Sequence, residues 1–303
     1  MIYFTDLNPR YVKEFEIDDF EKNRDNFAKS SFEYADGYGI ENALLLKKLG
    51  EDSKLFTILG GANKKTITSI LEKNKIDFSH VEINDNPREE IRILNKEGLT
   101  KIFGNLPRIT GQTERDLYML TKDLKQEDYF VVTDNDQKNI SDEVILNLIK
   151  LCRNNKIKVL ASFKDKILLR EDRVTGLVAS KNQVEEFFDL KINFESEGVK
   201  LAKAMTEKLA EKAFIISDGG VLYSDGENSY KAEFDFKDKK IDKNRFLGGL
   251  ALSLNRNYKD QLMLTTSLAI SLSKKSIYEI EMSDIKILSS DIKIRRLKWK
   301  IIR

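Results

Sequence analysis

Ile241-Asp242-Lys243-Asn244-Arg245-Phe246-Leu247-Gly248-Gly249-Leu250 places polar residues ahead of a run of apolar and small ones. The apolar residues recur at the spacing of one helix face, which predicts a helix from Asn244 to Leu254 that packs against the core. A second helix is expected from Asp260 to Leu272, joined to the first through Asn255-Arg256-Asn257. The basic residues near the beginning of the first helix could attract an anion, or could be ordinary solvated residues.

Upstream of this stretch, short apolar runs alternate with longer amphipathic segments. That order is typical of βα units around a mainly parallel sheet, so the predicted fold class is α/β. The expected core strands are Ile2 to Thr5, Lys54 to Leu59, Tyr129 to Thr133, Ile157 to Ser162, Gly176 to Ala179 and Ala213 to Ser217. The expected helices between them are Ile40 to Leu49, Lys65 to Lys73, Thr113 to Leu124, Asp142 to Asn154 and Gly198 to Glu211.

Two stretches, Tyr11 to Tyr34 and Phe78 to Phe103, alternate apolar and polar residues instead. A two-residue period is that of half-exposed strands. We expect strand insertions at about residues 11–34 and 78–103 that pair into a small sheet over the edge of the main domain. Such a sheet would serve as a lid, and it would offer a surface for a homodimer.

The composition limits the class of function. The 303 residues suit one α/β domain, and 52 Lys and Arg against 50 Asp and Glu leave a net charge of +2, too little to steer the protein to nucleic acid or a membrane. One cysteine, Cys152, and one histidine, His80, allow neither an internal disulfide nor a His/Cys zinc cluster. The first residues lack a signal-peptide pattern and no apolar run reaches about 18 residues, so we expect a cytoplasmic protein.

The C-terminal segment, Asp291 to Arg303, alternates apolar residues with lysine and arginine. A basic face with one tryptophan, Trp299, would allow weak contact with nucleic acid. A terminal strand that buries its apolar face, and whose lysines discourage edge pairing, explains the same pattern. We favour the strand and rank nucleic-acid binding last.

Several motifs resemble those of the ribokinase-like (phosphofructokinase-B) carbohydrate kinases. Asp6-Leu7-Asn8-Pro9 is similar to the Thr-Leu-Asn-Pro start of the 1-phosphofructokinase and tagatose-6-phosphate kinase branch, and Gly37-Tyr38-Gly39-Ile40 to its Gly-Gly-Lys-Gly-Ile-Asn signature. In the family's order follow Leu59-Gly60-Gly61, Arg88, Asn182-Gln183-Val184-Glu185, Ser217-Asp218-Gly219-Gly220 and the stretch quoted first, so the similarity runs from about Met1 to Leu272. Each fragment is weak alone, and their order carries the resemblance.

The resemblance implies a three-layer α/β/α fold, with one ribokinase-like domain over residues 1–303 that carries the β lid. It also implies transfer of the ATP γ-phosphate, with Mg²⁺, to a sugar phosphate, which needs a base for the hydroxyl proton and N–H groups for the developing charge. It places the base at Asn244, substrate contacts at Gly37, Gly39 and Arg88, and nucleotide contacts at Ser217, Gly219 and Lys243.

The family's metal motif keeps its Asn-x-x-Glu spacing as Asn182 and Glu185. That spacing suits an outer-sphere Mg²⁺ water network. Asn182 as a helix N-cap, with Glu185 closing a capping box, explains the pair equally well. Gly219 has a similar alternative, as a turn residue that leads into a hairpin from Gly220 to Tyr230.

The chain departs from the family's pattern at four places. Asn244 replaces the aspartate base, and an amide cannot accept a proton at neutral pH. Ile241 and Lys243 replace the glycines of the anion hole, where backbone approaches phosphate. The sugar side is changed as well, because Val12 replaces an acidic residue, Tyr38 and Glu41 replace lysine and asparagine, and Thr133-Asp134-Asn135-Asp136-Gln137 stands where Gly-Ser-Leu-Pro is expected.

Three functions are compatible with this pattern. The chain is a working ATP-dependent sugar-phosphate kinase, or a catalytically impaired relative that binds a ligand or a protein partner as a pseudokinase, or a weak nucleic-acid binder. The impaired relative explains all four departures with one relaxation of constraint, so we favour it. Fold resemblance alone does not decide between them, because function resides in the site.

Overall fold

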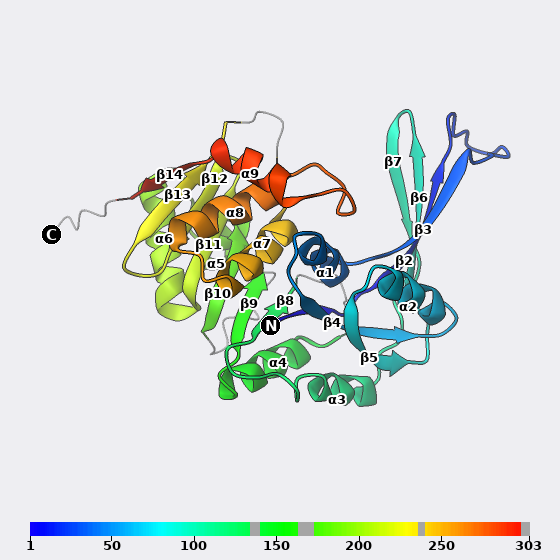
Figure 1. The fold of residues 1–303 in the computed structure, drawn as a ribbon, viewed down its shortest axis with the longest axis horizontal. Helices are drawn as coiled ribbons and strands as arrows, with labels where there is room; N and C mark the ends of the chain where they lie inside the picture. The colour runs from blue at the N-terminus through cyan, green and yellow to red at the C-terminus, as the bar shows by residue number, and fades with distance from the viewer. Residues whose placement is uncertain (134–139, 163–172, 236–239, 298–303) are drawn as a thin grey trace.

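A sheet of ten strands runs through the computed structural model, which describes residues 1–133, 140–162, 173–235 and 240–297. The strand order is β14-β13-β12-β11-β10-β9-β8-β1-β4-β5 (Figure 1). The seven strands from β5 to β11 in this order are parallel, and β12, β13 and β14 are antiparallel. Their bounds are β1 Ile2–Asp6, β4 Ser53–Gly60, β5 Asp77–Ile83, β8 Tyr129–Val132, β9 Lys158–Ser162, β10 Val174–Ser180, β11 Ala210–Ser217, β12 Gly220–Ser224, β13 Ser229–Glu233 and β14 Lys293–Arg296.

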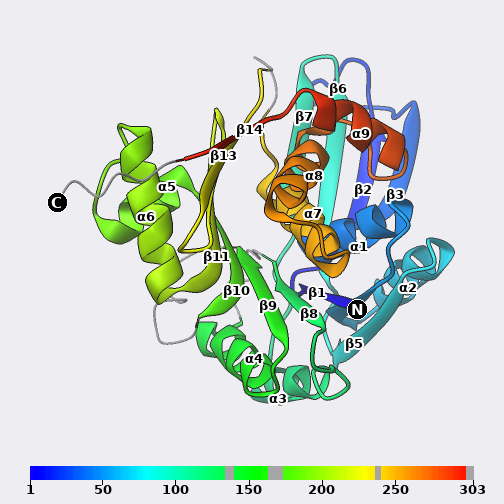
Figure 2. The same ribbon diagram turned by 60° about the vertical axis from the view of Figure 1, so that its left-hand side comes forward.

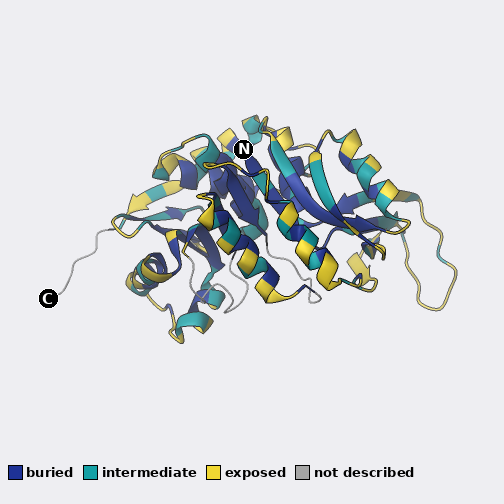
Figure 3. Cartoon of the chain, turned by 90° about the horizontal axis from the view of Figure 1, so that it is seen from below, coloured by how far each residue is buried: buried dark blue, intermediate teal, exposed yellow. Residues whose placement is uncertain are grey.

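Helices cover both faces of this sheet, and each face has its own apolar core (Figure 2). One core holds side chains of α1 Tyr38–Lys48, α2 Lys64–Lys73, α7 Lys243–Asn255, α8 Asp260–Leu272 and α9 Met282–Ser290. The other holds side chains of α3 Gly111–Met119, α4 Asp142–Asn154, α5 Lys181–Phe188 and α6 Glu195–Lys208. The predicted α/β fold class, with its three layers, is therefore confirmed, and the strands are buried between the layers (Figure 3).

A second sheet of four strands projects from one end of the molecule (Figure 1). Its order is β3-β2-β6-β7, with bounds β2 Arg10–Glu16, β3 Ser30–Asp36, β6 Arg88–Asn95 and β7 Gly98–Phe103. We call this sheet the lid. The predicted insertion at 78–103 is too long, because its first part lies in β5, which pairs in parallel with β4 in the main sheet. An edge strand covered on one face shows the same alternation as a lid strand.

Two helix ends differ from the sequence-based prediction. The helix expected from Gly198 to Glu211 ends at Lys208, because Ala210 already pairs with Val174 in the sheet. The helix expected to reach Leu124 ends at Met119, after which the backbone continues in tighter turns, with Leu120 N–H donating to the Leu117 carbonyl. Strand pairing overrides local helix preference in the first case, and α-helices commonly end in such turns in the second.

Of the C-terminal strand expected over Asp291 to Arg303, the stretch Lys293–Arg296 is confirmed as β14, which pairs with β13, and residues 298–303 lie outside the described part of the chain. Its Arg295 forms two hydrogen bonds with the Glu195 carboxylate, and its Arg296 donates to Asn228. Trp299 lies outside the described residues. In the described part of the chain, no helix combines the length and the apolar character that crossing a membrane requires.

Close packing of α1, α7 and α8 fixes the position of the helix that the first motif predicted. A Cβ atom at Gly248 would lie 2.2 Å from Asn42 Oδ1, and one at Gly249 would lie 2.9 Å from the Cα of Ser267. Such distances are well below van der Waals contact, so these two glycines let the backbones approach. The consequence is that the first turns of α1 and α7 meet at the edge of the sheet where β1 ends.

Candidate active site

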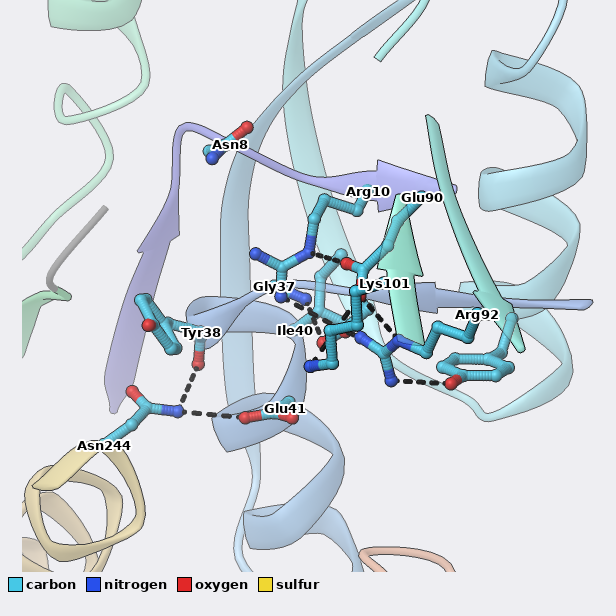
Figure 4. Close-up of polar contacts among 12 residues, drawn as sticks. Asn8, Arg10, Gly37, Tyr38, Ile40, Glu41, Glu90, Arg92, Lys101 and Asn244 are labelled. Carbon is cyan, nitrogen blue, oxygen red and sulfur yellow. Dashed lines mark hydrogen bonds and ion pairs between the residues drawn. The ribbon is translucent and has the colours of Figure 1, made fainter. Parts of the chain in front are cut away.

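Asn244 joins the first turns of α1 and α7 through three hydrogen bonds (Figure 4). Its Nδ2 donates to the Tyr38 carbonyl at 3.2 Å and to Glu41 Oε2 at 3.3 Å, and its Oδ1 accepts from Asn42 Nδ2 at 2.9 Å. Two of the three partners of Asn244 are therefore acceptors. The arrangement suits an amide, because a carboxylate in its place could donate to neither.

The first turn of α1 already holds a carboxylate from the same chain. Asp6, at the end of β1, is 2% exposed, and its Oδ2 accepts the backbone N–H groups of Gly39 at 3.0 Å and Ile40 at 3.1 Å. The approach requires glycine, since a Cβ atom at Gly37 would lie 2.1 Å from Asp6 Oδ2. Gly37 also has a φ of 146°, which side chains disfavour. Burial raises the pKa of Asp6 to about 6, although the N–H groups of Ile40 and Asn8 and the charge of Arg10 act in the opposite direction.

The first turn of α7 is closed in the same manner by its N-cap residue. Asp242 Oδ1 accepts the backbone N–H of Arg245 at 3.0 Å. The Arg245 guanidinium turns away to the carbonyls of Ser273 at 2.8 Å and Lys275 at 3.0 Å. The N–H groups at the beginning of a helix are the donors that bind phosphate in many proteins. Here an internal carboxylate occupies one of them and adds negative charge.

Largely buried ion pairs join three strands of the lid, β2, β3 and β6, next to these helix ends (Figure 4). Asp36, the last residue of β3, pairs with Arg10 at 3.1 Å and with Arg92, and both arginines also pair with Glu90, at 2.9 Å and 2.6 Å. Burial raises the pKa of Asp36, but the two guanidiniums outweigh it and hold that pKa below its usual range. Lys101 of β7 lies 3.8 Å from Glu90.

Glu41 is the titratable group closest to Asn244. Burial raises the pKa of its carboxyl to about 7, and the nearby Asp36 and Asp242 carboxylates act in the same direction. Arg245 and Arg10 act in the opposite direction. A carboxyl with a pKa near 7 is half protonated at neutral pH, which is the range in which general acids and bases work best.

The predicted substrate and nucleotide residues lie along the edge of the sheet and lid. Arg88 begins β6, where its Nε donates to the Gly104 carbonyl at 3.0 Å and its guanidinium lies over the Phe103 ring. Ser217 ends β11, and its Oγ donates to the Gly220 carbonyl at 3.2 Å. Gly219 lies exposed in the turn from β11 to β12, with open space beside it. Lys243 is the first residue of α7.

The metal motif lies in α5, after β10. Asn182 is exposed there, and Glu185 is buried, with Oε1 accepting the Ile192 N–H at 2.8 Å and Oε2 accepting from Lys191 at 3.3 Å. The alternative reading of Asn182 as the N-cap is wrong, because Ser180 caps α5 and forms the capping box with Gln183. Among the described residues, no group of three or more His, Cys, Asp and Glu side chains could hold a metal ion. Glu185 has both oxygens engaged, so a metal role for this pair stays a prediction.

The remaining altered positions are only partly described. Val12 is fully buried in β2, so it offers no polar group to a ligand. Thr133 is buried too, and its Oγ1 donates to the Thr5 carbonyl at 2.7 Å. The residues after it, 134–137, lie outside the described part of the chain.

Comparison with known proteins agrees with the geometry. Residues 11–258 match the model of the pfkB family carbohydrate kinases. The chain belongs to this family. It is 24% identical over 231 residues to 1-phosphofructokinase of Borreliella burgdorferi, a match that covers 75% of this chain and 75% of the relative. It is 22% identical over 228 residues to 1-phosphofructokinase of Bacillus subtilis, a match that covers 74% of this chain and 75% of the relative. The tetrameric inhibited form of phosphofructokinase-2 from Escherichia coli superposes with a TM-score of 0.84, at 14% identity and 95% and 98% coverage.

Membership in the pfkB family has direct implications for cofactors and substrates. Kinases of this family use ATP, usually with Mg²⁺, and act on sugars or sugar phosphates. The resemblance inferred from the short motifs is thus confirmed at the level of the family. The assignment of individual residues to substrate, nucleotide and metal stays a prediction.

Sequence reasoning missed the buried charges around the site. It did not single out Asp36, Arg10, Arg92, Glu90 or the capping role of Asp242. The adjacent Asp36-Gly37 pair before a helix was the available signal, because an acidic residue and a glycine there indicate a tightly closed helix N-terminus. The ion pairs themselves join residues far apart in sequence, which no local pattern reveals.

Proposed function

We propose that this pfkB family member is a sugar-phosphate kinase of the 1-phosphofructokinase type whose phosphoryl transfer is impaired. It would move the γ-phosphate of ATP to a sugar phosphate such as fructose 1-phosphate at no more than a trace rate. The observation that carries the proposal is the closure of the α7 N-terminus by Asp242, with Ile241 and Lys243 beside it instead of glycines.

An anion hole stabilises the charge that develops on the transferred phosphoryl group. It needs free backbone N–H groups and backbone that phosphate can approach closely. At the α7 N-terminus, the Asp242 carboxylate would repel the incoming anion and competes for an N–H donor. Arg245 offsets part of that charge, but its Nη1 donates to two backbone carbonyls of the segment after α8 and is engaged there.

The position of the family's base supports the same proposal. Asn244 cannot accept the hydroxyl proton, and its amide is already bonded on both sides. General-base assistance typically contributes roughly 10²–10⁴-fold in rate. Loss of the aspartate from α7, together with the closed anion hole, would therefore lower the rate far below that of ordinary kinases.

Substitution of Asn244 by aspartate is expected not to restore activity. The new carboxylate would face the Tyr38 carbonyl and the Glu41 carboxylate, so it would be repelled and protonated instead of acting as a base. A coupled ADP-release assay with ATP-Mg²⁺ and fructose 1-phosphate, fructose 6-phosphate or tagatose 6-phosphate measures the result. We expect the variant to remain within about tenfold of the wild type. A rise of about 10²-fold or more would show that the base was the only defect.

The ligand sites follow from the same family membership. We assign the sugar phosphate to the region where the lid meets α1, near Gly37, Gly39 and Arg88, and the nucleotide to the sheet edge near Ser217, Gly219 and Lys243. Support comes from the common edge on which β1, β11 and the α7 N-terminus lie, since ligands of open parallel sheets bind outside the carboxyl ends of the strands. A thermal-shift titration with ATP tests the nucleotide half, and no shift at millimolar ATP would favour a purely protein-binding role.

The lid offers the surface for the predicted homodimer. Several of its large apolar side chains are between one third and two thirds exposed, which is uncommon for a monomer: Phe32, Ile91, Leu94, Leu99, Ile102 and Phe103. The strand register places Phe32, Leu94, Leu99 and Phe103 on one face of the lid, and a second copy of the lid would cover that face. Sedimentation of the protein as a monomer at micromolar concentration would contradict this assignment.

A further inference from the structure

The junction of helices α1 and α7 contains one carboxylate and one amide that are hydrogen-bonded to each other. Asn244 stands on the first turn of α7 and donates through Nδ2 to Oε2 of Glu41 on the first turn of α1 (Figure 4). The amide cannot turn over, because its Oδ1 accepts from Asn42 while its Nδ2 faces the Tyr38 carbonyl. Position 244 is thus built for a donor and position 41 for its acceptor.

Glu41 is suited to accept a proton. Its side chain is only partly exposed, and one oxygen, Oε2, is held by Asn244, which leaves Oε1 for a ligand. Helix α1 points its positive end toward this turn, which favours a carboxylate there. Charged and titratable groups face Glu41 from each neighbouring element: Asp36 of β3, Arg10 of β2, Asp242 and Arg245 at α7, and Tyr278 before α9.

We propose that Glu41 is the proton acceptor at this helix junction, so that the carboxylate the family carries on α7 and the amide it carries on α1 have exchanged places in this chain. The inference rests on the proposed function, since it names the residue that supports the remaining transfer. The sugar hydroxyl gives its proton to Glu41 Oε1 while its oxygen attacks the γ-phosphorus of ATP. The bond from that phosphorus to the bridging oxygen breaks, ADP leaves with the electron pair, and Glu41 later releases the proton to solvent.

The exchange would supply a proton acceptor but would not repair the anion hole. A proton acceptor on α1 approaches the hydroxyl from the opposite helix, so it restores the proton transfer and leaves the anion hole of α7 defective. The transfer is therefore slow, although a base is present. The pKa of Glu41, near 7, would make the residual rate depend on pH in the neutral range.

The test compares Glu41→Gln, the exchange variant Glu41→Asn with Asn244→Asp, and Glu72→Gln as an exposed control on α2. ADP release with ATP-Mg²⁺ and fructose 1-phosphate is followed over many hours from pH 5.5 to 9. The wild-type rate is expected to rise through about pH 7 and then level off, and Glu41→Gln to lower it by about 10²-fold and to remove the pH step. The exchange variant is expected to exceed Glu41→Gln, and the Glu72→Gln control to match the wild type.

Two results would overturn the inference. One is a Glu41→Gln rate equal to that of the wild type with the same pH profile, in protein whose circular dichroism shows it folded. The other is a wild-type rate no greater than that of the enzyme-free blank. This result would contradict the role of Glu41 as a proton acceptor, and it would agree with the proposed impairment of phosphoryl transfer. If Glu41→Gln does not fold, Glu41→Asp replaces it, and a rate and pH step unchanged by that shortening would equally contradict the inference. Ordinary turnover that depends on Glu41 would instead overturn the impairment and support the inference.

Discussion

Replacement of Asp36 by alanine is expected to lower the free energy of unfolding by about 3–5 kcal/mol, the usual cost of removing one partner from a buried ion pair. Asp36 is 4% exposed and pairs with both Arg10 and Arg92. Without Asp36, the largely buried guanidiniums of Arg10 and Arg92 both depend on the Glu90 carboxylate for an ion pair. Urea denaturation followed by circular dichroism measures the change.

The control is Lys96→Ala, at the end of the same lid. Lys96 pairs with Asp19 at 3.1 Å, but both side chains are largely exposed. Exposed pairs contribute about 0–1 kcal/mol, so this variant should unfold close to the wild type. An Asp36→Ala variant within 1 kcal/mol of wild-type stability would show that this network of ion pairs does not stabilise the lid strands.

The stability of the protein is expected to fall as the pH rises from 5 to 8. Burial raises the folded-state pKa of Asp6 to about 6 and that of Glu41 to about 7, above the values these groups have in the unfolded chain. The protonated forms therefore stabilise the native state fully below about pH 4, and this contribution is lost as the pH passes through 6 and 7. We expect a loss on the order of 2–4 kcal/mol.

Thermal unfolding between pH 5 and pH 8 tests this expectation. The unfolding midpoint of the wild type should fall by about 5 °C or more over the range, and by less in Asp6→Asn and in Glu41→Gln. Glu72→Gln, an exposed site, should follow the wild type. Asp36 acts in the opposite direction, because its pKa is lowered, and its contribution is lost only in more acidic solution. An unfolding midpoint that is constant or rises from pH 5 to pH 8 would contradict the raised pKa values of Asp6 and Glu41 in the folded protein.

The periodicity of the sequence predicted the core strands and the helices that flank them, because burial between two layers leaves a strong apolar signal. The periodicity did not distinguish an edge strand of the main sheet from a strand of the lid, because both alternate apolar and polar residues. Edge strand β5 and the lid strands both alternate, so Asp77–Ile83 was assigned to the wrong sheet. Residues near 209–211 favour a helix locally, and only their pairing partner, Val174, settles the question.

The site was predictable to a smaller extent. The order of the motifs indicated the family and matched Asn244, Gly37 and Gly39 to its signatures. It also indicated a defective α7 N-terminus. The closing carboxylates were not predictable, because Asp6 reaches Gly39 across 33 positions of the chain and Glu41 reaches Asn244 across 203. From the sequence, Glu41 was only a replacement for the asparagine of the family's signature. Its bond to Asn244 gives it a partner that only the folded chain provides.

The steady-state turnover of the purified wild-type protein tests the central claim most directly. ADP release is measured with saturating ATP-Mg²⁺ and each of fructose 1-phosphate, fructose 6-phosphate and tagatose 6-phosphate. Because Asp242 closes the α7 N-terminus and Asn244 replaces the base, we expect turnover at least ~10²-fold below the ordinary enzyme range of ~1–10³ s⁻¹. Turnover within that range with any of the three sugar phosphates would contradict the account.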